Sequence, residues 1–392
     1  MSQRSKTGKP HCWVVTGGGT GGHIYPALAA IQQIRDDELP VDIQYVGKTH
    51  GMEADKVPAQ NISFYGIQFS GMPRSMTWRW VPWLFQLSMA TLQVLWQFLT
   101  RWKPSVVFST GGYVTAPVLL AALLTRTPYV VHEPDAHAGL VNRLFSRWAS
   151  HVTTAFEKAF PGLPTERVTV AGNPIRSSIA PSVDRDSQKK AFSSFFSEVT
   201  LNHCDDEDEP TVLLVTGGSQ GAASINQAVV NSLETLLKRP SVYVVHQTGA
   251  RGYDDTKKWL KEISLSEEQT ARYWCQPFIE DMPSALSIAS LALCRSGSLT
   301  LSEHCAAGVP MILVPYPYAA ADHQTKNAQR LVDAGAARLI CDEELTCERF
   351  LEEWGDLLEH PEILKNMAKA SMDKGRQGAA SVIVEKLRRL SI

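Results

Sequence analysis

The sequence predicts an α/β fold made of two Rossmann-like domains, each built on a parallel sheet. The 392 residues are enough for two or three domains, each with its own core. Short β-rich runs alternate with longer amphipathic segments, which is the βαβ rhythm of a parallel sheet. The rhythm stops in a polar stretch over 182–210 and then starts again, so a second sheet follows the first.

Each predicted strand is followed by a turn signal and a helical pattern. The strands expected in the first half are 11–16, 42–46, 106–109, 129–132 and 168–170. Those expected in the second half are 211–215, 242–247, 291–295 and 311–314. A helix is predicted over 298–307, ending at Gly308, and apolar periodicity predicts a final helical segment over 362–390.

Both halves begin with a strand, a glycine-rich turn and a helix. The turns are residues 17–22 and 217–221, about 200 residues apart. Backbone N–H groups in such turns, together with the positive end of the helix, hold phosphates. The repeated unit predicts a first domain over 1–176 and a second over 177–361, with a cleft between them. The helical segment 362–392 is a candidate to pack back on the first domain.

Composition excludes several classes of function. The net charge of −2 argues against a nucleic-acid binder that depends on positive charge. The seven cysteines contain no CxxC pair, and no His, Cys or Asp spacing resembles a metal site. We therefore expect a mechanism without metal or cofactor. The sequence does not read as having a signal peptide or a spanning helix, so a reduced, cytoplasmic compartment fits best.

Basic and aromatic residues gather in the first half. Residues 1–180 hold 16 Lys and Arg against 10 Asp and Glu, whereas the rest of the chain is acidic. The segment Trp78-Arg79-Trp80-Val-Pro-Trp83 has the composition of a loop at a lipid headgroup boundary. We expect it to dock the first domain reversibly on an anionic membrane surface.

Apolar residues beyond that segment follow one another at steps of four and three. They are Phe85, Met89, Leu92, Trp96 and Leu99. Such a stripe shares one helix face, and we expect this face to pack into the core of the first domain.

Two ionisable side chains lie where they could act on a bound ligand. His23 directly follows the first glycine-rich turn, so it could be a general base near neutral pH or only a helix cap. Glu303 on the helix 298–307 has uncharged neighbours three and four residues away, which favours an acceptor for hydroxyl groups over a solvated glutamate. His132 and Glu133 end a predicted strand, where they could serve a ligand or only shape the loop.

The first turn also fits a dinucleotide fingerprint. Gly17, Gly19 and Gly22 have the spacing, and Asp42 lies about where a ribose-binding acid would be. An NAD-dependent oxidoreductase is therefore an alternative. The fingerprint does not explain His23.

Several motifs occur together and in order. They are Gly17-Gly-Gly-Thr20-Gly-Gly-His23 with Pro26, Gly111-Gly-Tyr113, Gly172-Asn-Pro-Ile-Arg176, Gly217-Gly-Ser219-Gln-Gly-Ala222, Phe278-Ile279-Glu-Asp-Met282, Arg295-Ser-Gly-Ser-Leu-Thr300-Leu-Ser-Glu303, and Asp322-His-Gln324 with Asn327. Over nearly the whole chain they resemble the MurG family, the bacterial N-acetylglucosaminyltransferases of peptidoglycan lipid-intermediate synthesis.

The resemblance implies a GT-B fold, in which two Rossmann-like domains face a central cleft. It implies inverting transfer of N-acetylglucosamine from UDP-N-acetylglucosamine to undecaprenyl-diphospho-muramoylpentapeptide. The enzyme would act as a peripheral protein at the cytoplasmic face of the inner membrane. Alternatives are another GT-B enzyme of UDP-sugars, either a UDP-N-acetylglucosamine 2-epimerase or a glycolipid glycosyltransferase, and a non-catalytic nucleotide-sugar module.

The resemblance also implies roles for single residues. Those expected to contact the donor are Thr20, Gly21, Gly22, Arg176, Ser219, Ile279, Ser298, Leu299, Thr300, Glu303 and Gln324. Ile279 would place the uracil through its backbone, and Glu303 would bind the ribose. Those expected in the acceptor and phosphate loops are Gly18, Gly19, Gly111, Gly112 and Tyr113.

The sequence departs from the family at one place near the donor site. It has His132-Glu133-Pro134-Asp135 where the family has His-Glu-Gln-Asn, so a carboxylate that can only accept replaces an amide. Our first choice for the catalytic base is His23, with Asp135 and His132 in reserve. The charge on the departing diphosphate would be met by loop amides near Ser219.

Overall fold

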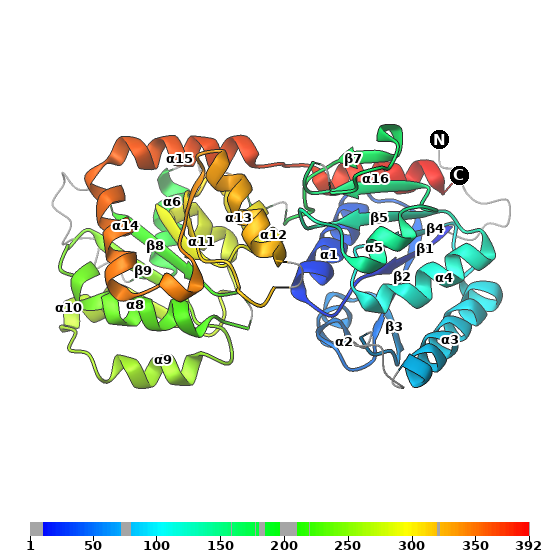
Figure 1. The fold of residues 1–392 in the computed structure, drawn as a ribbon, viewed down its shortest axis with the longest axis horizontal. Helices are drawn as coiled ribbons and strands as arrows, with labels where there is room; N and C mark the ends of the chain where they lie inside the picture. Colours follow the sequence, from blue (N-terminus) through cyan, green and yellow to red (C-terminus); the bar gives the residue numbers. More distant parts are fainter. Residues whose placement is uncertain are drawn as a thin grey trace. The chain divides into compact units, whose positions relative to one another are not determined.

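A computed structural model describes residues 11–71, 80–157, 159–176, 178–179, 185–196, 210–218, 220–319 and 322–391. The chain forms two compact units (Figure 1). The first unit consists of Met1–Arg176 together with Gln377–Ile392, and the second is Ser177–Arg376. Most of the polar stretch 182–210 lies outside the described residues.

The described part of the first unit holds a seven-stranded sheet in the order β3-β2-β1-β4-β5-β6-β7. Neighbouring strands are parallel. The strands are β1 (His11–Thr16), β2 (Val41–Lys48), β3 (Ser63–Ile67), β4 (Val106–Ser109), β5 (Tyr129–Glu133), β6 (His151–Thr154) and β7 (Val168–Val170). The helices include α1 (Gly21–Asp36), α2 (Met52–Lys56), α3 (Trp80–Gln97), α4 (Ala116–Thr125), α5 (Leu140–Phe145) and α16 (Ala379–Leu390).

The described part of the second unit holds a six-stranded parallel sheet in the order β10-β9-β8-β11-β12-β13. The strands are β8 (Thr211–Thr216), β9 (Val242–Gln247), β10 (Tyr273–Gln276), β11 (Leu291–Cys294), β12 (Met311–Leu313) and β13 (Ala337–Leu339). The helices include α6 (Arg185–Ser193), α8 (Ala223–Leu236), α9 (Tyr253–Leu260), α10 (Glu267–Ala271), α11 (Met282–Ile288), α12 (Ser298–Ala307), α13 (His323–Asp333), α14 (Cys347–Glu359) and α15 (Pro361–Lys374). The predicted α/β class with two parallel sheets is confirmed.

Each sheet reverses its strand order once. The reversal lies between β1 and β4 in the first unit and between β8 and β11 in the second. In open α/β sheets, ligands bind outside the carboxyl ends of the strands at this switch point. The glycine-rich turns 17–22 and 217–221 follow β1 and β8, so both lie where the topology predicts a ligand.

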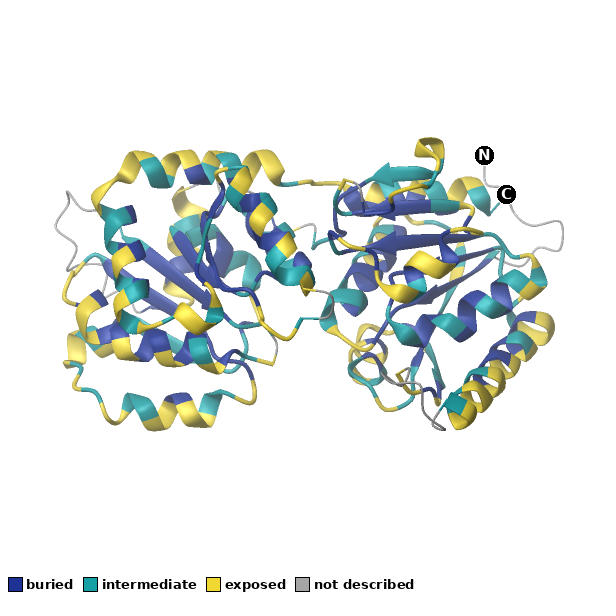
Figure 2. Ribbon diagram, viewed as in Figure 1, coloured by how far each residue is buried: buried dark blue, intermediate teal, exposed yellow. Residues whose placement is uncertain are grey.

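The last helix completes the core of the first unit. The predicted helical segment 362–390 is two helices, α15 in the second unit and α16 in the first. α16 packs against α1, and its Ile383 and Leu387 are fully buried beside residues of β4 and β5. Figure 2 shows that the strands of both sheets are mostly buried. The central strands of the sheet in the first unit are buried on both faces, which explains why their sequences are almost continuously apolar.

The expectation that the stripe on α3 is a core face is wrong. Its side chains are 43–67% exposed, and they are Phe85, Met89, Leu92, Trp96 and Leu99. The face that packs in the core instead carries Ala90, Thr91, Val94 and, one turn on, Phe98. α3 has apolar residues on both faces, and periodicity alone does not tell which one meets the protein.

The expectation of a membrane-docking loop also changes. Trp78 and Arg79 lie outside the described residues, and Trp80 begins α3 with Pro82 in the first turn. Trp83 is partly buried, packs on Phe69 and donates its indole N–H to the Ser70 carbonyl at 3.1 Å. Trp80 and Trp83 therefore belong to a helix, in which Pro is tolerated because first-turn N–H groups have no intrahelical acceptor.

None of the helices in the described part of the chain is both long enough and apolar enough to cross a membrane.

Candidate active site

His23 lies in the first turn of α1, next to the switch point of the first sheet. Its Nδ1 is 2.9 Å from the Thr110 carbonyl oxygen, just after β4. A carbonyl oxygen only accepts, so Nδ1 carries the proton and, in the neutral ring, Nε2 carries the lone pair. The Thr110 hydroxyl donates back to the His23 carbonyl at 2.6 Å. The ring is half-buried, and its tautomer is the one that a base acting through Nε2 needs.

The two glycine loops of the first unit touch each other. A Cβ on Gly17 would lie 2.0 Å from the Thr110 hydroxyl, and one on Gly112 would lie 2.2 Å from the Gly18 carbonyl oxygen. Gly112 also has φ +88°, which favours glycine. The structure thus brings together the loops predicted to hold acceptor phosphates, including Gly19 and Gly111. The Tyr113 ring borders them, 3.3 Å from the Cβ position of Gly19.

His132 is fully buried at the end of β5. Its Nδ1 is 3.1 Å from the Thr153 hydroxyl, and its Nε2 is 3.0 Å from the Asn173 side-chain carbonyl oxygen. Burial lowers the pKa of His132 to about 4. These contacts favour a structural role for His132 over that of a reserve base.

Glu133 organises the loop that carries Asp135. The carboxylate is 1% exposed and accepts from the backbone N–H groups of Asp135 and Gly139 and from the Asn142 side chain, each at 3.0 Å. Burial raises the pKa of Glu133 to about 7. The alternative that this part of the chain shapes the loop is confirmed for Glu133. Asp135 itself is half-buried on that loop.

The predicted donor residues of the first unit lie around the start of α1. Thr20 is exposed, and its carbonyl accepts from His23 N–H at 3.1 Å. Gly21 and Gly22 form the first turn. The Arg176 guanidinium lies 6.0 Å from the centre of the ring of Tyr25, which is on α1. Arg176 therefore shares this end of α1 with the glycine loop.

The second glycine loop is held by the end of β9. Ser219 lies outside the described residues, but Gly218 and Gly221 flank it. A Cβ on Gly221 would lie 2.1 Å from the Thr248 carbonyl oxygen, so this glycine loop is in direct contact with the loop that follows β9. The Gln247 side chain donates to the Gly218 carbonyl at 3.2 Å and accepts from Ile279 N–H at 3.0 Å.

Our sequence analysis missed Gln247. The one available signal was an amide at the last position of a predicted strand, where ligands collect. Ile279 is buried, and of its two backbone groups the N–H is already engaged by Gln247.

Arg295 supports the turn that leads from β11 into α12. Its guanidinium donates to the carbonyls of Val314 and Pro315 and pairs with the Asp342 carboxylate at 2.5 Å. α12 then begins with Ser298, which is buried, whereas the predicted donor residues Leu299, Thr300 and Glu303 are half-buried. The helix ends at Gly308 in the left-handed conformation, as predicted.

Gln324, at the start of α13, holds the loop that follows β12. Its side-chain carbonyl accepts from Tyr316 N–H at 3.0 Å. Within the described residues, no three or more His, Cys, Asp or Glu side chains gather as a metal site would require.

Comparison with known proteins covers nearly the whole chain. The glycosyltransferase family 28 N-terminal domain matches residues 13–154, and the glycosyltransferase family 28 C-terminal domain matches residues 212–383. A protein of Desulforamulus reducens is 36% identical over 95% of this chain and 96% of its own length. One of Limosilactobacillus reuteri is 35% identical, with the same coverage. Both are named UDP-N-acetylglucosamine–N-acetylmuramyl-(pentapeptide) pyrophosphoryl-undecaprenol N-acetylglucosamine transferase.

Solved structures agree in fold. The crystal structure of Acinetobacter baumannii MurG matches with a TM-score of 0.73 and 29% identity, covering 97% of this chain and 99% of that one. A UDP-GlcNAc 2-epimerase from Neisseria meningitidis, bound to UDP-GlcNAc, matches with a TM-score of 0.62 over 97% and 100% of the two chains. At 16% identity the second likeness concerns the fold alone.

Proposed function

The chain belongs to glycosyltransferase family 28 and, within it, to the MurG enzymes, and from that premise we propose that it transfers N-acetylglucosamine from UDP-N-acetylglucosamine to undecaprenyl-diphospho-muramoylpentapeptide. The observation that carries the proposal is similarity of 34–37% over about 95% of the chain to relatives named for this transfer. The alternative of a 2-epimerase has support from the fold only. An oxidoreductase has only the glycine spacing in its favour.

His23 is the proposed catalytic base. The acceptor hydroxyl oxygen forms a bond to the anomeric carbon of the donor sugar, and the bond from that carbon to the diphosphate oxygen breaks. The hydroxyl proton passes to His23 Nε2, and UDP leaves with the bonding electrons. The Thr110 carbonyl supports this role because its contact keeps the proton on Nδ1.

The second unit supplies most of the proposed donor contacts, and the first unit supplies Thr20, Gly21, Gly22 and Arg176. Backbone N–H groups of the loop 217–221 and the N-terminus of α8 face the charge that grows on UDP. Ser219 and Arg176 add donors to the diphosphate. Glu303 accepts from the ribose hydroxyls, and Gln324 contacts the sugar. The segment from Ser298 to Thr300 cradles the nucleotide at the start of α12.

Membrane docking is assigned to the exposed face of α3 rather than to a loop. We call this surface the α3 apolar face; it consists of Val81, Phe85, Met89, Leu92 and Trp96 on α3 and of Leu99 in the π-helical turn Phe98–Trp102 that follows it. Arg101 lies 5.2 Å from the Trp96 ring centre, and residues 80–103 contain no Asp or Glu. A contiguous apolar surface beside cations suits an anionic lipid surface. We place the enzyme at the cytoplasmic face of the bacterial inner membrane.

Turnover with purified substrates tests the activity. UDP-N-acetylglucosamine and a polyprenyl-diphosphate muramoylpentapeptide should yield a disaccharide product and UDP in equal amounts. The same donor without acceptor should give no UDP and no 2-epimer, and NAD should not bind. Epimer formation or NAD reduction without sugar transfer would contradict the proposal.

Vesicle binding tests the membrane surface. The double variant Leu92→Gln/Trp96→Gln should bind phosphatidylglycerol vesicles more weakly than the native chain. Met372→Gln, which removes an exposed apolar side chain of the second unit, should bind as the native chain does. Salt should weaken native binding. Equal binding by the folded double variant would reject the α3 apolar face.

A further inference from the structure

Gln247 uses both ends of its side-chain amide to join two loops. It is the last residue of β9 and is 3% exposed. Its Nε2 donates to the Gly218 carbonyl at 3.2 Å, on the loop after β8. Its Oε1 accepts from Ile279 N–H at 3.0 Å, on the loop after β10. One buried side chain therefore bonds the loops that follow both neighbours of its own strand.

These contacts restrict the backbone on both sides. A peptide unit is planar and trans, so holding Ile279 N–H also orients the Phe278 carbonyl, which points the opposite way. Gly218 has φ +79°, a conformation open to glycine at little cost. A bond to its carbonyl selects one orientation from the several that glycine allows. The amide is the group that serves both partners, because it accepts at one end and donates at the other.

The residues next to Gln247 bond the same strand ends. The Asn226 side chain on α8 donates to the Thr248 carbonyl at 2.9 Å, and Thr248 N–H donates to the Gln276 carbonyl at 3.1 Å. Gly249 packs directly on Gly221, since a Cβ on Gly249 would lie 2.1 Å from Gly221 N. The end of β9 is thus a rigid connection between the two loops.

We propose that Gln247 is a positioning residue that couples the loop 217–221 to the turn at Ile279, so that the diphosphate and the pyrimidine of a nucleoside diphosphate are recognised together. The inference rests on the proposed function, which assigns the first loop to the diphosphate and the second to the base. It assigns Gln247 no contact with the ligand. The effect of Gln247 is on how much binding of the diphosphate strengthens binding of the base, and the reverse.

Two variants separate the two contacts. Gln247→Glu keeps an acceptor for Ile279 N–H but loses the donor to Gly218. Gln247→Leu loses both contacts. Titration with uridine, UDP and CDP measures two ratios: the affinity gained from the two phosphates (UDP over uridine) and the selectivity for the base (UDP over CDP). We expect Gln247→Glu to lower the first ratio about 5- to 10-fold and leave the second unchanged, because the donor to the Gly218 carbonyl is replaced by a carboxylate oxygen that repels it.

Gln247→Leu should lower both ratios. Gln269→Leu is the matched control, because Gln269 also joins two backbone groups through both ends of its amide, Ser266 N–H and the Leu237 carbonyl. It lies before β10, at the other end of the strand from Ile279. Its loss should leave both ratios as in the native chain.

Each result has a separate meaning. If the native chain does not prefer UDP, the proposed function fails before Gln247 is tested. If it does, and folded Gln247→Glu keeps the native phosphate ratio, the coupling is rejected. A uniform loss of affinity for uridine, UDP and CDP, with both ratios intact, rejects it as well. Should Gln247→Leu not fold, Gln247→Glu, which has nearly the same volume, decides.

Discussion

The two units have the same kind of switch point but different side chains at it. In the first unit the loops after β1, β4 and β5 carry or adjoin groups that exchange protons, namely His23, Glu133 and Asp135. In the second unit the loops after β8, β9 and β10 are held by amides and a hydroxyl, namely those of Gln247, Asn226 and Thr248. The same fold thus carries titratable side chains at one switch point and amides at the other, in line with the proposed division between proton transfer and recognition.

The largest effect is expected at His23. His23→Ala should lower kcat about 10²- to 10⁴-fold, because a general base acts in the transition state, while UDP affinity stays near native. Steady-state kinetics and a separate UDP titration measure the two quantities. His50→Ala changes an exposed histidine of the same unit and should have native kinetics. A His23→Ala enzyme whose only defect is a raised donor KM would place His23 in recognition and remove the contrast.

The response to acid should also separate the units. Burial lowers the pKa of His246 to about 3 and that of His304 to about 4, against 6.5 in the unfolded chain. Below pH 6.5 the two histidines become protonated in the unfolded chain but stay neutral in the folded second unit. The free energy of unfolding of this unit therefore falls as pH falls. At 1.36 kcal/mol per pKa unit, two histidines cost about 4 kcal/mol between pH 7 and pH 5.

In the first unit shifts of both signs partly offset each other, because burial lowers the pKa of His132 and of His151 but raises that of Glu133. His132 loses stability with acid as the other buried histidines do. Glu133, with its pKa raised to about 7, is protonated in the folded unit before it is in the unfolded chain, so acid stabilises it. Hydrogen exchange of β1 and β4 amides, compared with β8 and β11 amides, reports each unit. An equal loss of protection in both units would contradict the contrast.

Glu303 is the carboxylate among the proposed donor contacts, and it sharpens the comparison. Glu303→Gln should weaken UDP binding by about 1–3 kcal/mol, since a charge-assisted hydrogen bond becomes neutral. The loss should be the same at pH 6 and pH 8 if recognition in this unit involves no proton exchange. Glu359→Gln, at the exposed last residue of α14, is the control. Unchanged UDP affinity in calorimetry would make Glu303 structural.

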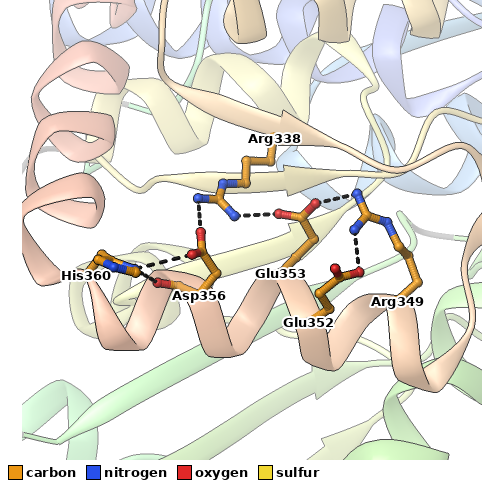
Figure 3. A network of polar contacts seen from close by, with 6 residues as sticks. All are labelled: Arg338, Arg349, Glu352, Glu353, Asp356 and His360. Atoms are coloured by element: carbon orange, nitrogen blue, oxygen red, sulfur yellow. Dashed lines mark hydrogen bonds and ion pairs between the residues drawn. The ribbon is translucent and has the colours of Figure 1, made fainter.

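The smallest effect is expected from the charges of the second unit that gather on β13 and α14. Arg338 pairs with Glu353 at 2.6 Å and with Asp356, and the same network includes Arg349, Glu352 and His360 (Figure 3). Arg338→Gln should cost at most about 1 kcal/mol in urea unfolding, because partly exposed ion pairs contribute little. UDP affinity should not change. A loss of UDP binding would extend the site to this surface.

Prediction of the strands from sequence succeeded mainly at the centre of each sheet, although the inner strand β6 was missed and the edge strand β7 was predicted. The predicted helix 298–307 coincides with α12, and the predicted strand 11–16 coincides with β1. The strands that the pattern missed are β3, β6, β10 and β13. β3, β10 and β13 are edge strands, which are only partly buried. An edge strand needs a less continuous apolar run, so its sequence stands out less from a loop.

Sequence singles out a candidate residue where one residue type has a special chemistry, and misses it where partners are distant in sequence. His23 is a candidate because a histidine follows a glycine-rich turn, and its role as a base stays a prediction. Gln247 was not singled out, because its partners Gly218 and Ile279 lie 29 and 32 residues away. The α3 apolar face was misassigned for a related reason. Both faces of that helix are apolar, and only the packing of α4 on one of them decides which is core.

The return of α16 to the first unit has a consequence for synthesis on the ribosome. Ile383 and Leu387 cover α1, yet they are translated after the 200 residues 177–376 of the second unit. At a translation rate of 5–20 residues per second, about 10–40 s pass between synthesis of the first part of this unit and synthesis of α16, which buries the apolar side of α1. Through that interval the nascent first unit lacks part of its core, and a chaperone has a binding surface there. Completion of the first unit is thus a late event, although most of its residues are translated before the second unit.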